Sequence, residues 1–195
     1  MGRKTQVTKE QLLEAGLQIV IRSGYSAVSI KTVAAEFGCS TSPIVWSFEN
    51  IDNYRRELRI YAKQYMDRKM LGDGSNVTDD HRKTGYVYVD MALDEPNLIR
   101  YLRINENELQ ASGGIGFIFN SEKNSNIANG WTKAFGVSEE EAVSFMQFIT
   151  TYTEGVVSLI LSGVIHPTKD GAHKMLDESA YAYMAYLKSR GSHCE

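Results

Sequence analysis

The sequence predicts an all-α protein of about nine helices, with a short helix-turn-helix head and a larger helical body. Apolar residues recur at helical spacing along most of the chain, helix-capping residues precede these stretches, and no convincing strand pair is present. Hydrophobic residues make up 43% and charged residues 23% of the 195 residues, which is typical of a globular protein. The chain lacks an apolar run long enough for a membrane span and an apolar signal core after Met1. The two cysteines fit no metal or redox spacing, so we expect a cytoplasmic protein.

The first helix is expected to begin at Thr8, because Thr8 and Gln11 have the spacing of a capping box. Leu17 and Val20 belong to its apolar stripe, and Gly24 ends it.

The segment from Ser29 to Phe48 is typical of a helix-turn-helix. Ser29 is expected to cap a helix that ends at Gly38, and Ser40 is placed to cap a second, shorter helix. The apolar stripe of the first of these helices is formed by Ile30, Val33, Ala34 and Phe37. The second helix of such a motif has the right size for a DNA major groove. Sequence-specific binding of double-stranded DNA is therefore the leading hypothesis.

Pro43 lies in the first turn of this second helix. Because proline disfavours helical geometry in the residue before it, the helix is expected to begin late, at Ser42 instead of Ser40. Ile44 and Phe48 are expected to be buried and to hold the helix in the head.

The candidate DNA-contacting residues carry hydroxyl, apolar or basic side chains. They are Arg3, Lys4, Ser29, Lys31, Ser40, Thr41, Ser42, Val45, Trp46 and Ser47. The hydroxyls suit base edges or phosphates, and Val45 suits a thymine methyl group. Trp46 either packs on sugar and phosphate or covers the fourth helix. Lys31 suits a phosphate, and Arg3 with Lys4 forms either a minor-groove arm or a solvated terminus.

The predicted domains are a DNA-binding head, 1–53, and a ligand-binding and dimerisation body, 54–195, connected by a helix over 54–70. Residues 1–70 carry 11 Lys/Arg against 7 Asp/Glu, and residues 71–195 carry 10 against 17. A basic head on an acidic body suits a protein that binds DNA at one end. Arg55, Arg56 and Arg59 are interpreted as a solvated face of the connecting helix in preference to DNA contacts.

Further helices are expected over 78–93, 96–110, 127–135, 138–162 and 171–189. Ser138 and Glu141 have capping-box spacing, and Pro96 suits a first helical turn. The glycine-rich stretch 110–126 is expected to be a loop or a short irregular helix.

The N-terminal residues resemble the TetR family of bacterial transcriptional regulators. The matching positions are Leu12-Leu13-Glu-Ala15, Gly24-Tyr25, Ser29-Ile30, Val33-Ala34, Gly38, Ser40 and Phe48. The resemblance implies a homodimer formed by the last two helices, a ligand pocket among the middle helices, and repression through a near-palindromic operator. Three positions depart from the family pattern: Pro43, Val45 where Tyr is usual, and Ile51 where Lys is frequent. These departures motivate a rival hypothesis, a small-molecule-binding or protein-interaction module whose head no longer reads DNA.

Aromatic and flexible apolar side chains in the body are candidates for lining a pocket for an apolar or aromatic small ligand, although dense core packing explains each of them singly. They are Tyr86, Met91, Tyr101, Phe117, Trp131, Phe148 and Tyr152. Small and apolar residues in the last two long helices are candidates for the dimer interface, or for packing within their own domain. They are Thr150, Gly155, Ser158, Leu159, Ser162, Tyr183 and Leu187.

No catalytic, metal or cofactor site is predicted. The four histidines are isolated, and no two of them have the i, i+4 spacing of a helical metal site. The glycines at 113, 114 and 116 do not follow a predicted strand, so they are not a nucleotide-binding fingerprint.

Overall fold

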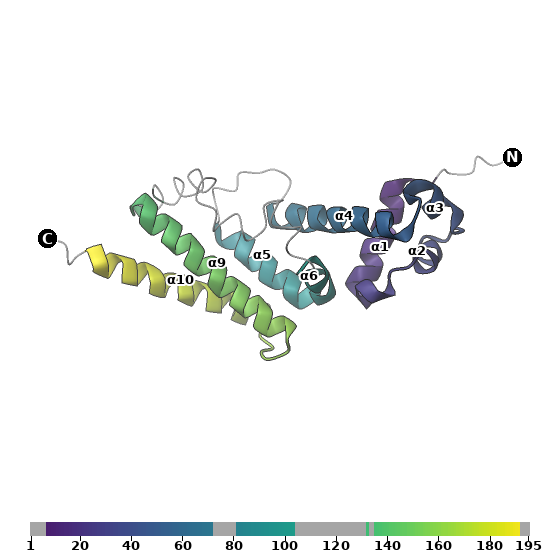
Figure 1. Cartoon of the computed structure of the whole chain (residues 1–195). Coiled ribbons are helices and arrows are strands. Elements are labelled where there is room, and N and C mark those ends of the chain that lie inside the picture. The colour runs from purple at the N-terminus through teal and green to yellow at the C-terminus, as the bar shows by residue number, and fades with distance from the viewer. Residues whose placement is uncertain (1–6, 72–80, 104–131, 133–134, 192–195) are drawn as a thin grey trace. The chain divides into compact units, whose positions relative to one another are not determined.

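The computed structural model describes residues 7–71, 81–103, 132 and 135–191, and these residues form an all-α protein (Figure 1). Within these ranges there are eight α-helices, one short 3-10 helix and no strand. The helices are α1 (Lys9–Ser23), α2 (Ile30–Phe37), α3 (Ser42–Phe48), α4 (Ile51–Leu71), α5 (His81–Asp94), α6 (Pro96–Arg103), α9 (Glu139–Leu161) and α10 (Lys169–Gly191), with η1 (Tyr25–Ala27). The all-α prediction is confirmed. Most of the expected helix over 127–135, and the whole stretch 110–126, lie outside the described residues.

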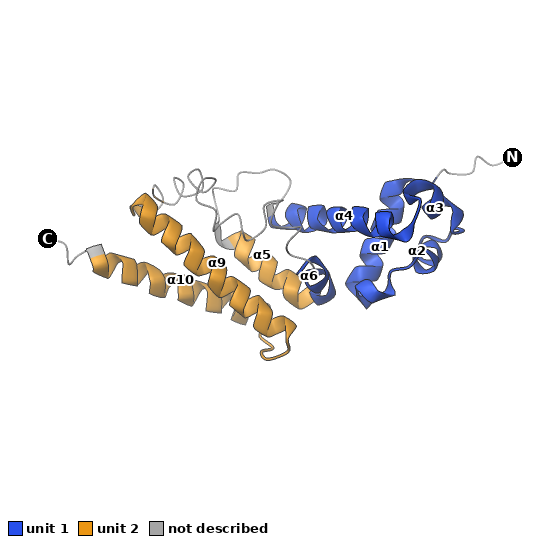
Figure 2. Ribbon diagram, viewed as in Figure 1, with its two compact units in different colours: residues 1–73, 95–104 blue, residues 74–94, 105–195 orange. Residues whose placement is uncertain are grey.

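The chain forms two compact units (Figure 2). The first contains residues 1–73 and 95–104, and the second contains residues 74–94 and 105–195. Helices α4 and α6 therefore belong to the same unit as the helix-turn-helix. The functional division expected at residue 53 stays a prediction, since compactness divides the chain at other positions.

Three helix ends of the first unit, the starts of α1 and α2 and the end of α2, are those that the sequence predicts. Thr8 Oγ1 accepts from the Gln11 N–H at 3.2 Å, and the Thr8 N–H donates to Gln11 Oε1 at 3.0 Å. Ser29 caps α2 through the Thr32 N–H, also at 3.2 Å. Gly38 ends α2 with a φ of 74°, in the left-handed region where a Cβ atom is unfavourable. These bonds join residues close in sequence, which explains why the sequence predicts them.

The core of the first unit joins the second half of the helix-turn-helix to α1 and α4. Ile44 and Phe48 of α3 are almost fully buried, as predicted, and so are Leu17 and Tyr54. The rings of Phe48 and Tyr54 meet edge to face with centroids 4.9 Å apart. Burial raises the pKa of Tyr54, so its hydroxyl stays protonated and donates to the Leu12 carbonyl at 2.8 Å. One aromatic pair thus locks α3 against α4.

The second unit is built from α5, α9 and α10, which pack on one another. The Tyr86 ring stacks on His173 with centroids 4.2 Å apart, and its hydroxyl donates to Asp177 Oδ1 at 2.5 Å. His173 Nε2 lies 2.8 Å from Asp90 Oδ1. These contacts join α5 to α10 along one side.

None of the helices that the structure describes is both long enough and apolar enough to cross a membrane. Among the same residues, no group of three His, Cys, Asp or Glu side chains is arranged to hold a metal ion.

Candidate nucleic-acid interface

Helix α3 begins at Ser42, the later of the two starts considered from the sequence. The expectation that Ser40 caps it is wrong. Thr41 precedes the helix instead, with αR geometry and no capping hydrogen bond from its side chain. Pro43 explains this difference. It stands in the first turn of α3 and has no N–H, so it cannot donate a hydrogen bond to a capping side chain.

Helix α3 presents one face to solvent and buries the opposite one. Ile44 and Phe48 point into the core, whereas Trp46 is 83% exposed and Val45 is 41% exposed. Ser42 is also exposed, and its i, i+3, i+4 spacing to Val45 and Trp46 places the three on one side of the helix. The alternative in which Trp46 covers α4 is excluded by this exposure. An indole so exposed on a firmly anchored helix is available to a partner.

The other candidate DNA contacts surround this face unevenly. Lys31, Ser40 and Thr41 are exposed, and Ser47 is half-buried. Ser29 Oγ already accepts from the Thr32 N–H as a helix cap. Arg3 and Lys4 lie outside the described residues.

The turn after α3 is strained at Glu49. Its φ of 66° and ψ of −50° are rare for a residue with a side chain. The Asn50 N–H donates to the Phe48 carbonyl at 2.7 Å. This hydrogen bond, between residues two positions apart, makes Phe48, Glu49 and Asn50 a γ-turn with Glu49 at its centre. The Glu49 carboxylate meets Asn53 Nδ2 at 3.4 Å. The strained turn lets the Asn50 side chain cap α4, where Oδ1 accepts from the Asn53 N–H at 2.9 Å.

Replacing Glu49 with glycine is expected to stabilise the protein by about 1 kcal/mol, because glycine adopts a positive φ without a Cβ penalty. Equilibrium unfolding in urea, followed by circular dichroism, measures the change. Glu49→Ala is the matched control: it removes the same carboxylate but keeps the Cβ atom, so it should bring no gain. Equal stability of the two variants would contradict strain at this position.

Arg55 and Arg59 are partly buried and do not form a solvated face, so that prediction is wrong for these two residues. Arg55 Nη2 donates to the Val28 carbonyl at 3.3 Å, and Arg59 Nη2 donates to the Leu102 carbonyl, also at 3.3 Å. Their guanidinium groups lie over the Tyr25 and Tyr101 rings, at 5.3 and 5.7 Å from the centroids. The last carbonyls of a helix such as α6 have no N–H partner within the helix and need donors from elsewhere. This need is the signal that was missed in the sequence. Arg56, in contrast, is exposed and donates to Asn53 Oδ1 at 2.8 Å.

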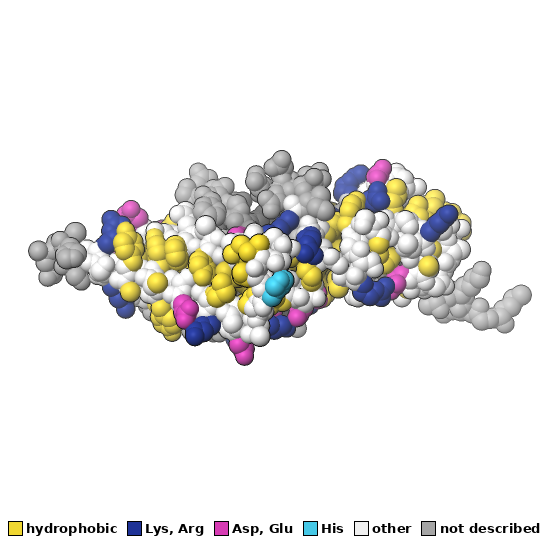
Figure 3. Space-filling view, turned by 90° about the horizontal axis from the view of Figure 1, so that it is seen from below, with side chains coloured by type: hydrophobic (Ala, Val, Ile, Leu, Met, Phe, Trp, Pro, Cys, Tyr) yellow, Lys and Arg dark blue, Asp and Glu magenta, His cyan; other side chains and the backbone are white. Residues whose placement is uncertain are grey.

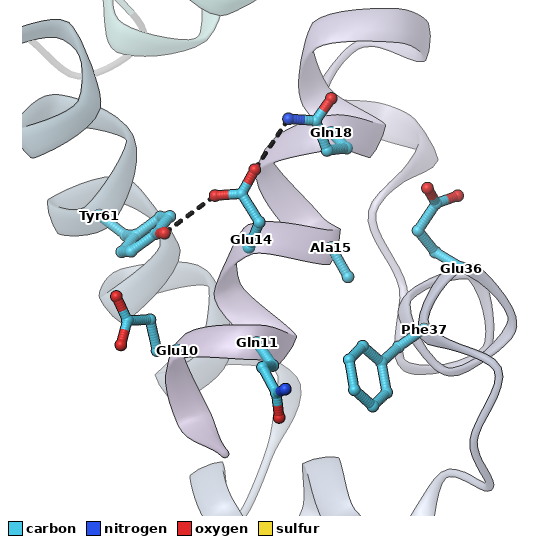
Figure 4. A pocket seen from close by; sticks show the side chains of 8 residues that line it. All are labelled: Glu10, Gln11, Glu14, Ala15, Gln18, Glu36, Phe37 and Tyr61. Carbon is cyan, nitrogen blue, oxygen red and sulfur yellow. Dashed lines mark hydrogen bonds between the residues drawn. The ribbon is translucent and has the colours of Figure 1, made fainter. Parts of the chain in front are cut away.

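A groove of about 420 Å³ opens on the first unit beside α1, α2 and α4 (Figure 4). It is lined by Glu10, Gln11, Glu14, Ala15, Gln18, Glu36, Phe37 and Tyr61. Glu14 lies between two donors, Tyr61 Oη at 2.9 Å and Gln18 Nε2 at 2.8 Å (Figure 4). The groove carries three carboxylates, which repel phosphates, so it is not suited to DNA.

The candidate ligand-binding residues do not all fall in one place. Tyr101 belongs to the first unit, where it is buried and stacks on Tyr25 with centroids 4.9 Å apart. Tyr86, Met91, Phe148 and Tyr152 belong to the second unit, and Met91 is buried there. Phe148 and Tyr152 are neighbours, with centroids 6.3 Å apart. Phe117 and Trp131 lie outside the described residues.

The candidate dimer residues separate into two groups. Tyr183 and Leu187 pack within the chain, since Tyr183 stacks on Phe148 at 4.2 Å and Leu187 is only 4% exposed. Gly155, Ser158, Leu159 and Ser162 are exposed, and Thr150 is half-buried.

Comparison with known proteins reveals similarity at the level of the fold. No protein-family model and no curated protein sequence matches the chain. A TetR-like transcriptional regulator from Rhodococcus sp. RHA1 superposes with a TM-score of 0.61 at 15% identity, covering 95% of this chain and 98% of its own. A TetR family transcription regulator from Marinobacter aquaeolei VT8 gives a TM-score of 0.55 at 18% identity, with 89% and 94% covered.

A second transcriptional regulator from the same Rhodococcus strain gives a TM-score of 0.58 at 15% identity, with 92% and 97% covered. All three of these proteins are described as transcriptional regulators. Over nearly its whole length, the chain therefore has the fold of TetR-family transcriptional regulators, an N-terminal helix-turn-helix followed by a helical body.

Proposed function

We propose that this protein is a sequence-specific DNA-binding transcriptional regulator that acts as a homodimer on a near-palindromic operator. The observation that carries the proposal is the solvent-facing side of α3, where Trp46 is 83% exposed while Ile44 and Phe48 anchor the helix from behind. A rigid helix with an exposed face is the element that a helix-turn-helix protein inserts into the major groove.

Charge supports the same proposal. The first 70 residues carry a net +4, from 11 Lys/Arg against 7 Asp/Glu. Lys31 is exposed in the first turn of α2, where the helix N-terminus also favours a phosphate. Such contacts position a protein on DNA and release condensed counterions.

In the proposed mechanism, a small apolar or aromatic ligand binds the second unit and shifts the dimer to a state with lower operator affinity, which relieves repression. A ligand does this only through its different affinities for the two states. The choice of an apolar or aromatic ligand rests on the aromatic content of the second unit, in which Tyr86 stacks on His173 and Phe148 stacks on Tyr183.

The test is selection from a random DNA duplex pool with purified protein at near-physiological salt, followed by sequencing. A palindrome with two half-sites is the expected result. Trp46→Ala should then weaken binding to this palindrome at least about tenfold, because an exposed aromatic anchor is lost. Ile60→Ala is the control, since Ile60 is an apolar residue of the same unit, 56% exposed, on α4. Binding without sequence preference that vanishes with modest salt would favour the rival, a binding module with a degenerate head.

Dimer formation is proposed to use an apolar surface of the second unit, and it is tested separately from DNA binding. Hydrophobic side chains gather over the second unit on the face drawn in Figure 3. Leu159 on α9 and Tyr186 on α10 are exposed large apolar residues of this unit. We expect a dimer in sedimentation equilibrium and a shift toward monomer in Leu159→Glu, since a charge is costly in an apolar interface. A wild-type monomer at micromolar concentration would contradict the proposal.

A further inference from the structure

The composition of α3 restricts how it can recognise bases. The helix reads Ser-Pro-Ile-Val-Trp-Ser-Phe, so it has no Arg, Lys, Asn, Gln, Asp, Glu or His. Guanine is read mainly by Arg or Lys, adenine by Asn or Gln, and cytosine by Asp or Glu. None of these pairings is available to α3. Its polar side-chain groups are two serine hydroxyls, which bind any base edge with little preference, and the Trp46 indole N–H, a single donor that reads no base uniquely.

The exposed face of the helix is instead apolar at its centre. Val45 and Trp46 are 41% and 83% exposed, and Ser42 lies beside them one turn earlier. Within the major groove, the one apolar group on a standard base edge is the C5-methyl of thymine. Glu49, the first acidic side chain after the helix, directly follows its last residue and accepts from Asn53 Nδ2 at 3.4 Å.

We infer that α3 recognises its operator through the C5-methyl groups of thymine, packed against Val45 and Trp46. The inference rests on the proposed function, because it specifies what that same helix reads. The half-site is then rich in A·T pairs with thymines facing these two side chains. The net +4 of the first 70 residues supplies affinity for the backbone and carries no sequence information.

The test removes single methyl groups from the DNA. In the palindrome obtained by selection, each thymine is replaced in turn by deoxyuridine, which keeps the base pair and loses only the methyl. One or two positions per half-site should lose about fourfold in affinity, and both half-sites together about fifteenfold. Replacing the same T·A pair with 5-methylcytosine·G should retain more affinity than replacing it with C·G, because the methyl group stays.

Protein variants connect the methyl groups to the two side chains. In the double variant Val45→Ala/Trp46→Ala, deoxyuridine should change the affinity by less than about twofold, since the partner of the methyl is gone. Ile60→Ala should keep the full sensitivity. All three side chains are exposed, so their removal leaves the fold intact.

The outcomes separate this inference from the proposed function. The thymine inference is overturned if the selected palindrome keeps its affinity with deoxyuridine at every thymine, or if its half-sites contain no thymine. The proposal of sequence-specific DNA binding would remain in either case. A methyl effect that persists unchanged in the double variant assigns the contact to other residues and also overturns it. If no sequence is selected, both the thymine inference and the proposed function are overturned.

Discussion

Gly16→Ala is expected to destabilise the protein by about 2–4 kcal/mol, although alanine normally stabilises a helix interior relative to glycine by about 1 kcal/mol. A Cβ atom at position 16 would lie 1.9 Å from Tyr54 Oη and 3.0 Å from its Cζ. Tyr54 cannot move aside, because its ring is fully buried and its hydroxyl is bonded to the Leu12 carbonyl. The substitution therefore breaks a buried hydrogen bond or displaces α4 from α1.

Chemical unfolding of the wild type and three variants measures this effect. Tyr54→Phe alone should cost about 1 kcal/mol through the lost hydrogen bond. Combined with Gly16→Ala it should recover part of the loss, because the atom 1.9 Å away is removed. Gly85→Ala in α5 is the matched control: its Cβ atom would meet Leu176 Cδ1 at an ordinary 3.5 Å, so helix propensity should dominate. A Gly16→Ala protein as stable as wild type would show that α1 and α4 are not packed this closely.

Phe48→Ala is expected to cost about 3–5 kcal/mol, the range for removing a buried phenyl ring. Phe48 is 1% exposed, and its ring meets the Tyr54 ring edge to face. Lys9 Nζ lies over the Phe48 ring, 4.9 Å from the centroid of that ring. Because α3 has only seven residues, it depends on packing for its stability. Loss of this ring should therefore release the whole helix, and DNA binding should fall with it.

Trp46→Ala is the comparison that separates stability from recognition. Both residues are aromatic and lie on α3, but Trp46 is 83% exposed, so its removal should change the unfolding free energy by less than about 0.5 kcal/mol. Urea unfolding and operator binding, measured on both variants, should show a loss of both stability and binding in Phe48→Ala and a loss of binding alone in Trp46→Ala. Comparable losses of stability in the two variants would contradict the arrangement of α3 described above.

Helix ends were predictable because the interactions that set them are local. At Thr8, Ser29 and Ser138, a side-chain oxygen accepts from a backbone N–H three residues later. A pattern this short is visible in the sequence without knowledge of the fold. The cap expected at Ser40 was wrong because two local preferences competed there and the proline at position 43 prevailed.

Burial on α3 was also predictable, since Ile44 and Phe48 are four residues apart and share a face. The sequence left two positions open for Trp46, over α4 or in solvent. Only the packed unit excludes the first, because Tyr54 and Phe48 already fill the space between α3 and α4.

Residues whose partners are distant in the chain were beyond sequence reasoning. Tyr101 looked like a body aromatic, yet it stacks on Tyr25, 76 positions earlier, and its hydroxyl donates to the Arg55 carbonyl at 3.3 Å. Arg59 looked solvated, yet it binds carbonyls at the end of α6. Residue types and local spacing thus settled where helices begin, end and bury a face, because hydrogen bonds within one turn set those features. The tertiary structure alone decided which distant groups meet, because those contacts form only after the helices have packed.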